Sequence, residues 1–126
     1  MAHILIVDDE LMIRFLVRSV LESAGHSISE AQNGRVAFDM LEMYPHLIDI
    51  VVLDLQMPHM GGIEFLSILH PEITYPPIII LTAHRKLIQE TLAYKVSGTL
   101  TKPFRTRDLI NMVNSQVHLS GGQPLS

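Results

Sequence analysis

Polar side chains of three kinds stand at the ends of short apolar runs in this sequence. They are Asp8 and Asp9 after HILIV, Asp54 after IVVL, Thr82 after IIIL and Lys102 after TLT. Apolar runs of this length, rich in β-branched residues, are typical of buried parallel strands. The carboxyl ends of such strands meet at one edge of an open sheet, where ligands bind. We therefore expect these side chains to form one site.

The aspartates of this set predict a metal site. Acids directly after a strand can simply cap the next helix, but capping does not explain the matching positions of Asp54, Thr82 and Lys102. Carboxylates gathered at one edge repel one another unless a cation lies among them. Oxygen ligands without histidine or cysteine favour Mg²⁺, or Mn²⁺ in its place, and such an ion commonly shares its site with phosphate oxygens.

Lys102 and Thr82 indicate the reaction that the metal site serves. An ammonium group and a hydroxyl beside a carboxylate cluster suit an incoming phosphoryl group, which has three oxygens to satisfy. Asp54 can then act as a nucleophile and form an acyl phosphate. In-line phosphoryl transfer needs mainly positioning and charge neutralisation, which the cation and Lys102 provide. The small side chain of Ala83 leaves room for the phosphoryl group.

The hydrophobic pattern places these residues in a single α/β domain. Five strands are expected at residues 3–7, 27–31, 50–53, 78–81 and 99–101. Five helices are expected between and after them, at residues 11–24, 34–44, 63–69, 86–95 and 106–117. This alternation implies a doubly wound parallel sheet with right-handed crossovers. We expect the domain to occupy residues 1–118, followed by a flexible tail or the start of a linker at 119–126, LSGGQPLS.

Composition excludes several other classes of protein. With 126 residues, 48% hydrophobic and 17% charged, the chain is expected to fold as one compact domain. A net charge of −4 without a basic run argues against nucleic-acid binding by this domain. No apolar run is long enough to cross a bilayer, and no signal-type segment opens the chain. The absence of cysteine excludes disulfides and thiolate chemistry, and we expect a cytoplasmic location.

Four short motifs resemble those of a response-regulator receiver domain, the phosphoacceptor module of two-component signalling. They are VDDE (Val7 to Glu10), LDLQMPHMGG (Leu53 to Gly62), LTA (Leu81 to Ala83) and TKPF (Thr101 to Phe104). Each motif is weak alone, but their order and spacing make the set specific. Together they span the domain from Ile4 to about Val117.

The resemblance implies a fold, a reaction and a role for each site residue. The fold is flavodoxin-like with strand order 2-1-3-4-5, and a histidine kinase or phosphotransfer protein phosphorylates Asp54. Asp9, Asp54 and the backbone carbonyl of Gln56 ligate Mg²⁺ directly, while Asp8 acts largely through water. Lys102 pairs with the phosphoryl group, and Thr82 is the switch hydroxyl that moves to meet it. The domain is then not an enzyme for other substrates, because it catalyses only its own phosphorylation and dephosphorylation.

Two smaller expectations concern the loops of the site. The resemblance implies a cis peptide bond between Lys102 and Pro103, which an X-Pro bond tolerates at modest cost. The seven histidines lack metal-site spacing, but His59 and His84 stand in site loops, where either could contact the phosphoryl group or its water.

The region between Thr82 and Lys102 departs from the family pattern. It is a couple of residues short, and Thr99 replaces the usual aromatic residue whose rotation reshapes the output surface. We therefore expect the signal to leave through the loop after Thr82 and the helix at 86–95. A second copy or an output partner could use the face formed by helix 86–95, strand 99–101 and helix 106–117. The helix residues Leu87, Ile88, Thr91, Leu92 and Tyr94 are either an apolar face for that partner or part of the core.

Three other classes of protein are alternatives. An aspartyl-nucleophile phosphohydrolase would favour an acid two residues after Asp54, where Gln56 stands. A flavodoxin-like cofactor binder would need a Ser/Thr/Gly-rich phosphate loop where this chain has Asp8, Asp9 and Glu10. A degenerate receiver, working as a phosphorylation-independent interaction module, would not need the complete set of acids, threonine and lysine. We conclude that the sequence favours a phosphorylatable receiver.

Overall fold

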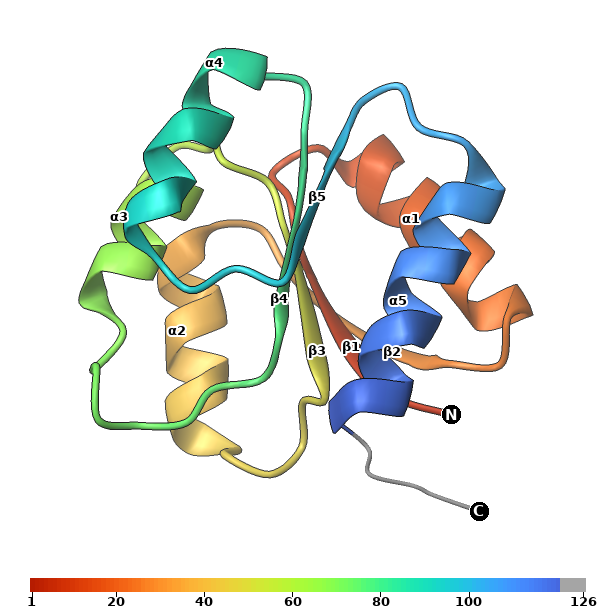
Figure 1. Ribbon diagram of the computed structural model, residues 1–126, viewed down its shortest axis with the longest axis horizontal. Helices are drawn as coiled ribbons and strands as arrows, with labels where there is room; N and C mark the ends of the chain where they lie inside the picture. The colour runs from red at the N-terminus through yellow and green to blue at the C-terminus, as the bar shows by residue number, and fades with distance from the viewer. Residues whose placement is uncertain (121–126) are drawn as a thin grey trace.

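Five parallel strands form one sheet, and helices cover both of its faces (Figure 1). The computed structural model describes residues 1–120. The strands are β1 (His3–Val7), β2 (Ser27–Ala31), β3 (Ile50–Leu53), β4 (Ile78–Thr82) and β5 (Gly98–Thr101). The helices are α1 (Leu11–Ser23), α2 (Gly34–Met43), α3 (Gly62–Ile68), α4 (Arg85–Ile88), the 3-10 helix η1 (Gln89–Ala93) and α5 (Thr106–Ser120). The spatial order β2-β1-β3-β4-β5 confirms the expected flavodoxin-like topology.

The sheet separates two hydrophobic clusters, because successive side chains of a strand point to opposite faces. Leu5 and Val7 of β1 pack in the cluster under α2 and α3. Ile4 and Ile6, their neighbours in sequence, pack in the cluster under α1 and α5. The buried central strands therefore read as continuous apolar runs, as expected of parallel strands covered on both faces.

Outside the segment at 86–95, the helix ends differ from the sequence prediction by one to three residues. Gly25, at φ 95°, ends α1 just beyond Ser23, in a backbone conformation that glycine adopts at low cost. The Asn33 side chain caps α2 by accepting a hydrogen bond from the Val36 N–H. Helix α5 continues through Ser120, past the expected end at residue 117. The remainder of the expected tail, residues 121–126, lies outside the described residues, so the domain boundary near residue 118 stays a prediction.

The helix expected at residues 86–95 is the largest difference. Only Arg85–Ile88 form an α-helix, η1 follows it, and the backbone is extended at Tyr94. The tighter winding is visible in two i→i−3 bonds, from Leu87 N–H to the His84 carbonyl and from Tyr94 N–H to the Thr91 carbonyl. The buried Thr91 hydroxyl also donates to the Ile88 carbonyl, a local bond that competes with regular helix geometry.

The apolar side chains of this short segment are mostly core. Leu87, Ile88 and Tyr94 pack against the cluster under α2 and α3, and Thr91 is buried. Leu92 alone among the five candidates is strongly exposed, at 84%. The core alternative therefore holds for Thr91 and in part for Leu87, Ile88 and Tyr94, and Leu92 remains the exposed candidate for a partner contact.

Candidate functional site

The strand register brings the chemistry-bearing residues together at the carboxyl edge of the sheet. Val7 pairs with Leu53 across β1 and β3, and the Asp54 N–H continues that ladder by donating to the Val7 carbonyl at 2.9 Å. Thr82 pairs with Thr101 across β4 and β5, and the Lys102 N–H donates to the Thr82 carbonyl at 2.9 Å. Asp54 and Lys102 thus sit one step past their strands, as the sequence predicts, whereas Thr82 is the last residue of β4.

Lys102 bridges two buried carboxylates. Its Nζ lies 2.7 Å from Asp8 Oδ2 and 3.6 Å from Asp54 Oδ2. Asp8 and Asp54 are 3% and 5% exposed, so both carboxylates need such a partner to remain charged. Their other oxygens accept backbone hydrogen bonds, Asp8 Oδ1 from Glu10 N–H at 2.9 Å and Asp54 Oδ1 from Leu55 N–H at 2.7 Å.

Burial and charge pull the pKa values of this pair in opposite directions. Burial raises the pKa of the Asp8 carboxyl, and the hydrogen bonds from Lys102 and the Glu10 N–H offset only part of that rise. Burial alone would lower the pKa of Lys102, but its hydrogen bond to Asp8 and the charges of Asp54 and Asp8 raise the pKa above its ordinary value. Lys102 therefore carries a positive charge at neutral pH.

Asp9 joins these two aspartates to form a cluster that suits a small hard cation. Carboxylate oxygens of Asp8, Asp9 and Asp54 lie within 4.8 Å of one another. The site opens as a cavity of about 500 Å³, lined by Asp9, Glu10, Asp54, Gln56, Met57, Pro58, Ala83, His84 and Lys102. All donors of the cluster are oxygens, and one face of it is open to water, so the residues fit Mg²⁺ or Mn²⁺.

Thr82 is near this cavity but does not line it. Its side chain is fully buried, and its Oγ1 accepts a hydrogen bond from the His84 N–H at 3.2 Å. The expected switch hydroxyl is thus directed at the backbone that leads into α4. Ala83 lines the cavity in its place, which agrees with the expected space for a phosphoryl group.

The two histidines of the site loops differ in position. His84 lines the cavity, whereas His59 is not among the lining residues. His59 is exposed and adopts φ 67°, a left-handed conformation that is uncommon for a residue other than glycine. The Lys102–Pro103 peptide is cis, as expected.

Gly62 allows the loop after β3 to fold closely under the site. A Cβ at this position would lie 2.4 Å from the Asp54 carbonyl oxygen and 2.9 Å from Leu55 Cα. Both contacts are with backbone, which cannot turn aside as a side chain can. The Gly62 N–H donates to the Leu55 carbonyl at 2.9 Å, so this close approach also anchors the start of α3.

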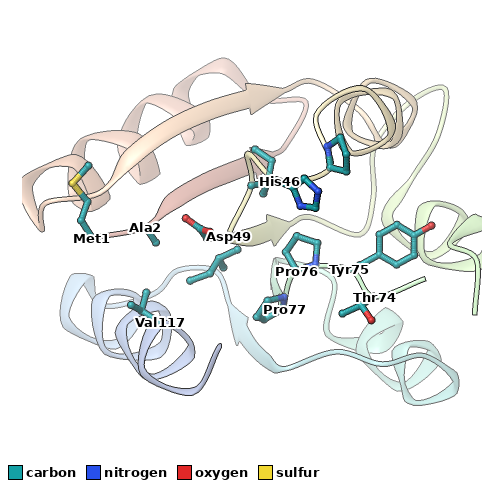
Figure 2. A pocket seen from close by; sticks show the side chains of 12 residues that line it. Met1, Ala2, His46, Asp49, Thr74, Tyr75, Pro76, Pro77 and Val117 are labelled. Carbon is teal, nitrogen blue, oxygen red and sulfur yellow. The ribbon is translucent and has the colours of Figure 1, made fainter. Parts of the chain in front are cut away.

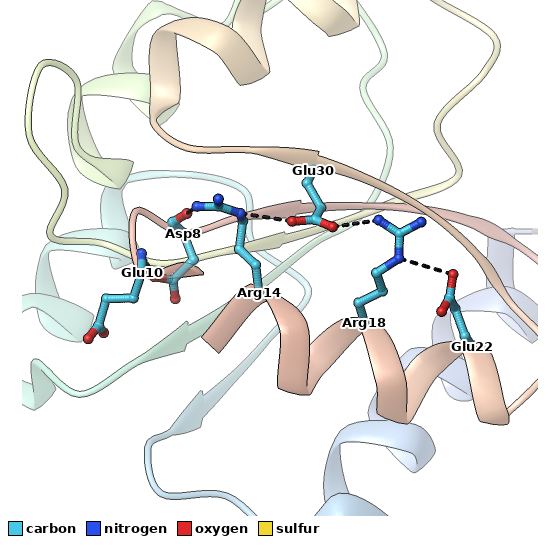
Figure 3. A network of polar contacts seen from close by, with 6 residues as sticks. All are labelled: Asp8, Glu10, Arg14, Arg18, Glu22 and Glu30. Carbon is cyan, nitrogen blue, oxygen red and sulfur yellow. Dashed lines mark hydrogen bonds and ion pairs between the residues drawn. The ribbon is translucent and has the colours of Figure 1, made fainter. Parts of the chain in front are cut away.

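Arg14 is a site neighbour that the sequence reasoning missed. Together with Arg18 and Glu22 it forms the polar stripe of α1, a pattern that predicts only a solvated helix face. In the structure its guanidinium donates to the backbone carbonyl of Asp8 at 2.7 Å (Figure 3). The sequence feature that could have indicated this role is Glu30 in β2, an acid that pairs with the arginines of α1.

Two further cavities lie away from the aspartates. One, of about 390 Å³, is lined at the amino end of the sheet by residues that include Met1, Asp49 and Pro77, with Val117 of α5 on its other side (Figure 2). The other, of about 630 Å³, lies between the proline-rich connection 70–77 and the segment 93–97. Neither contains a residue of the acidic cluster, so the carboxyl edge holds the candidate site.

A doubly wound sheet with an acidic cluster and a lysine at its carboxyl edge defines a class of phosphoryl-accepting signalling domains. The family model described as the response regulator receiver domain matches residues 4–114. The chain belongs to this family, and it is a receiver domain of two-component response regulators. Within residues 1–120, every helix is too short or too polar to span a membrane.

Relatives of known sequence are similar over most of this chain. A probable transcriptional regulatory protein of Picosynechococcus is 33% identical over 116 residues, which cover 86% of this chain and 46% of that protein. The transcriptional regulatory protein CpxR of Escherichia coli is 32% identical over 117 residues, covering 91% of this chain and 49% of that protein. The chain thus spans about half the length of these two relatives.

Solved structures give the same result. The chemotaxis protein CheY4 of Vibrio cholerae matches with a TM-score of 0.80 and 32% identity, over 91% of this chain and 98% of that one. A response regulator receiver domain protein of Clostridium thermocellum matches with a TM-score of 0.85 and 27% identity, over 96% of this chain and 98% of that one.

Proposed function

We propose that this receiver domain accepts a phosphoryl group on Asp54 and changes its protein contacts as a result. One observation carries the proposal: three aspartate carboxylates lie within 4.8 Å of one another, with the Lys102 ammonium 2.7 Å from one and 3.6 Å from another. Like charges at this spacing need a cation among them. A hydrolase for other substrates is disfavoured, because Gln56 stands where a second acid would serve as acid and base.

The metal would be held by Asp9, Asp54 and the Gln56 backbone carbonyl, with Asp8 acting through water. Gln56 and Asp9 line the cavity beside Asp54, and Asp8 lies beneath them. When bound, Mg²⁺ or Mn²⁺ neutralises the phosphoryl oxygens and orients them for in-line attack. Without it, the acidic cluster repels a dianionic donor.

Asp54 is the nucleophile of this proposal. Its Oδ1 is held by the Leu55 N–H, which fixes the carboxylate plane, and its Oδ2 faces Lys102. One carboxylate oxygen forms the new P–O bond while the P–N bond of the donor's phosphohistidine breaks. The electron pair stays on the imidazole nitrogen, which then holds a proton from solvent. Lys102 can turn from Asp8 toward the transferred group, because its flexible stem already places Nζ between both carboxylates.

Thr82 is the switch in this proposal, and its backbone contact suggests how the signal leaves. The hydroxyl now accepts from the His84 N–H, one residue before α4. Donating instead to a phosphoryl oxygen requires the hydroxyl to turn away from His84, which frees the loop that leads into α4. This route does not need an aromatic ring, and Thr99 has none.

The phosphodonor is a histidine kinase or a phosphotransfer protein in this proposal. Helix α1 begins directly after Glu10, which lines the cavity, and its outer face exposes apolar side chains where a donor would approach. These are Leu11, Met12, Phe15 and Leu16, each at least 47% exposed. A second copy or an output partner would instead contact the face formed by α4, η1, β5 and α5, where Leu92 of η1 is exposed.

Intact mass after incubation with acetyl phosphate and Mg²⁺ tests the proposal. Wild type should gain one phosphoryl group, and Asp54→Asn should gain none. Asp39→Asn is the matched control, because Asp39 is an exposed acid on α2 that pairs only with Arg35 among the ion pairs of the described residues. Labelling of Asp54→Asn would overturn the assignment. A wild type that resists labelling, with its fold intact, would favour the phosphorylation-independent module.

A further inference from the structure

Asp8 makes hydrogen bonds to four partners, and two of these bonds come from side chains, those of Lys102 and Arg14. Arg14, unlike Lys102, has no role in the phosphoryl chemistry described above. Its N–H donates to the Ala31 carbonyl, and its carboxylate accepts from Glu10 N–H and Lys102. The fourth contact is to its backbone carbonyl, which accepts from Arg14 Nη1 at 2.7 Å. This carbonyl belongs to the peptide that joins Asp8 to Asp9, so its orientation governs where Asp9 is directed.

Arg14 is itself fixed by a chain of ion pairs along α1 and β2 (Figure 3). Its Nε donates to Glu30 Oε1 at 2.9 Å, and its side chain is only 14% exposed. The other oxygen of Glu30 accepts from Arg18 at 2.5 Å, and Arg18 also pairs with Glu22 at 3.1 Å. A guanidinium that bonds a carboxylate and a carbonyl at once has its plane determined by both partners.

From this geometry we infer that Arg14 is a positioning residue for the metal site, with Glu30 as its orienting partner. The inference rests on the proposed function and extends it to residues outside the cavity. Arg14 touches neither the cation nor the phosphoryl group; it holds the Asp8–Asp9 peptide so that the exposed Asp9 carboxylate stays beside Asp8 and Asp54. Groups that orient metal ligands in this way commonly change metal affinity by about 10- to 100-fold when removed.

The charge of Arg14 and its positioning role predict opposite changes in Mg²⁺ affinity when Arg14 is replaced. Arg14 is a cation near an acidic cluster, so removing its charge should strengthen Mg²⁺ binding if charge were its only effect. If positioning dominates, Arg14→Gln should weaken Mg²⁺ binding. Arg14→Lys should weaken it too, because a single ammonium cannot reproduce the fork that reaches both Asp8 and Glu30.

The effect on Mg²⁺ affinity is measured by titrating the full chain with Mg²⁺ alone. Calorimetry and the NMR signals of the Asp9 and Glu10 amides monitor the titration. Arg14→Gln and Arg14→Lys should each bind Mg²⁺ about tenfold more weakly than wild type. Glu30→Ala, which leaves Arg14 but frees its Nε, should show a smaller loss in the same direction. Arg18→Gln is the matched control. It removes one positive charge from α1 and one ion pair with Glu30, as Arg14→Gln does, but Arg18 makes no contact with the Asp8 carbonyl. The Mg²⁺ affinity of this variant should stay within about twofold of wild type.

Equal or tighter Mg²⁺ binding by both Arg14 variants would overturn the inference, as would an equal loss in Arg18→Gln. If a variant of Arg14 fails to fold by circular dichroism, Glu30→Ala decides, and unchanged affinity there also overturns it. The proposed function fails separately, when wild type itself neither binds Mg²⁺ nor accepts a phosphoryl group. An Arg14 effect on urea stability without an effect on Mg²⁺ affinity would make the residue merely structural and would likewise overturn the inference.

Discussion

Helices α1 and α4 both begin at loops of the site, yet they are built in different ways. Helix α1 has 13 residues and is tied to β2 and to Asp8 by its arginines. Helix α4 has four residues and passes into η1, whose i→i−3 bonds have poorer geometry. Helix α1 exposes Leu11, Met12 and Phe15, whereas the segment α4–η1 turns Leu87 and Ile88 into the core.

The difference indicates a division of work between the two ends of the site. In the proposed function, the long, anchored helix α1 would keep the metal ligands in place and present a fixed surface to a phosphodonor. A short segment with few regular hydrogen bonds opens locally at lower cost, which suits an element that must move when Thr82 changes partner. Four measurements test this difference between α1 and α4.

We expect the largest effect on Mg²⁺ binding and labelling from substitutions in the loops that precede α1 and α4. Asp9→Ala, in the loop before α1, should abolish Mg²⁺ binding and labelling by acetyl phosphate, because the ligand cluster loses its exposed member. The fold should remain intact or gain slightly in stability, since one of several like charges is gone. His84→Ala, in the loop before α4, is the counterpart and should keep most labelling, because its backbone N–H to Thr82 is retained. Full labelling of Asp9→Ala, or of wild type in excess chelator, contradicts the comparison.

Amide hydrogen exchange should separate the two helices next. We expect amides of α4 and η1 to exchange at least about tenfold faster than those in the middle of α1, because short 3-10 winding opens locally. A phosphoryl mimic should then change exchange at residues 84–95 more than at residues 99–101. If exchange changed only at residues 99–101 and not at 84–95, the signal would pass through β5 and the proposed route through α4 would be wrong.

The exposed apolar side chains of α1 and of η1 should contact different partners, a phosphodonor protein and an output partner respectively. Phe15→Ala on α1 should slow transfer from a phosphohistidine donor protein about fivefold, as expected for an aromatic contact worth about 1 kcal/mol. Labelling by acetyl phosphate should be unchanged, since Phe15 does not line the cavity. Leu92→Ala is the matched substitution in η1 and should leave both rates unaltered. An equal slowing by the two variants would remove the distinction between donor and output surfaces.

The smallest effect concerns how α1 is anchored. Burial alone would raise the pKa of Glu30, but its hydrogen bonds from Arg18 and Arg14 outweigh this and lower the pKa below its ordinary value. A lowered carboxyl pKa stabilises the fold above the unfolded-state pKa, and that contribution is lost as the pH falls through the folded-state value. Glu30→Gln should therefore reduce the free energy of unfolding by less than about 1 kcal/mol at neutral pH, because the pair is partly exposed. Urea denaturation should show the difference from wild type vanishing in acid, and a constant difference would exclude the ion pairs as its source.

The parts of the site that the sequence could predict depend on strand ends. Asp8 and Asp54 follow buried runs directly, and Lys102 follows the partly exposed edge strand β5. Parallel register then leaves little freedom in where these side chains meet. The contact of Arg14 with the Asp8 carbonyl could not be predicted in the same way, because a backbone acceptor leaves no trace in residue type. The Thr91 hydroxyl bonds to the Ile88 carbonyl where α4 passes into η1, and the apolar period of 86–95 does not encode such a bond.

The two-sided core also affects how substitutions should combine. Ile79 and Ile80 are neighbours in sequence, yet they pack in different clusters on opposite faces of the sheet. Ile80 and Phe65 are far apart in sequence and share one cluster. Truncations at 79 and 80 should therefore add in their effect on stability, whereas truncations at 80 and 65 should not, because only the second pair shares packing partners. We therefore expect the coupling between substitutions in this domain to follow the faces of the sheet more closely than distance along the chain.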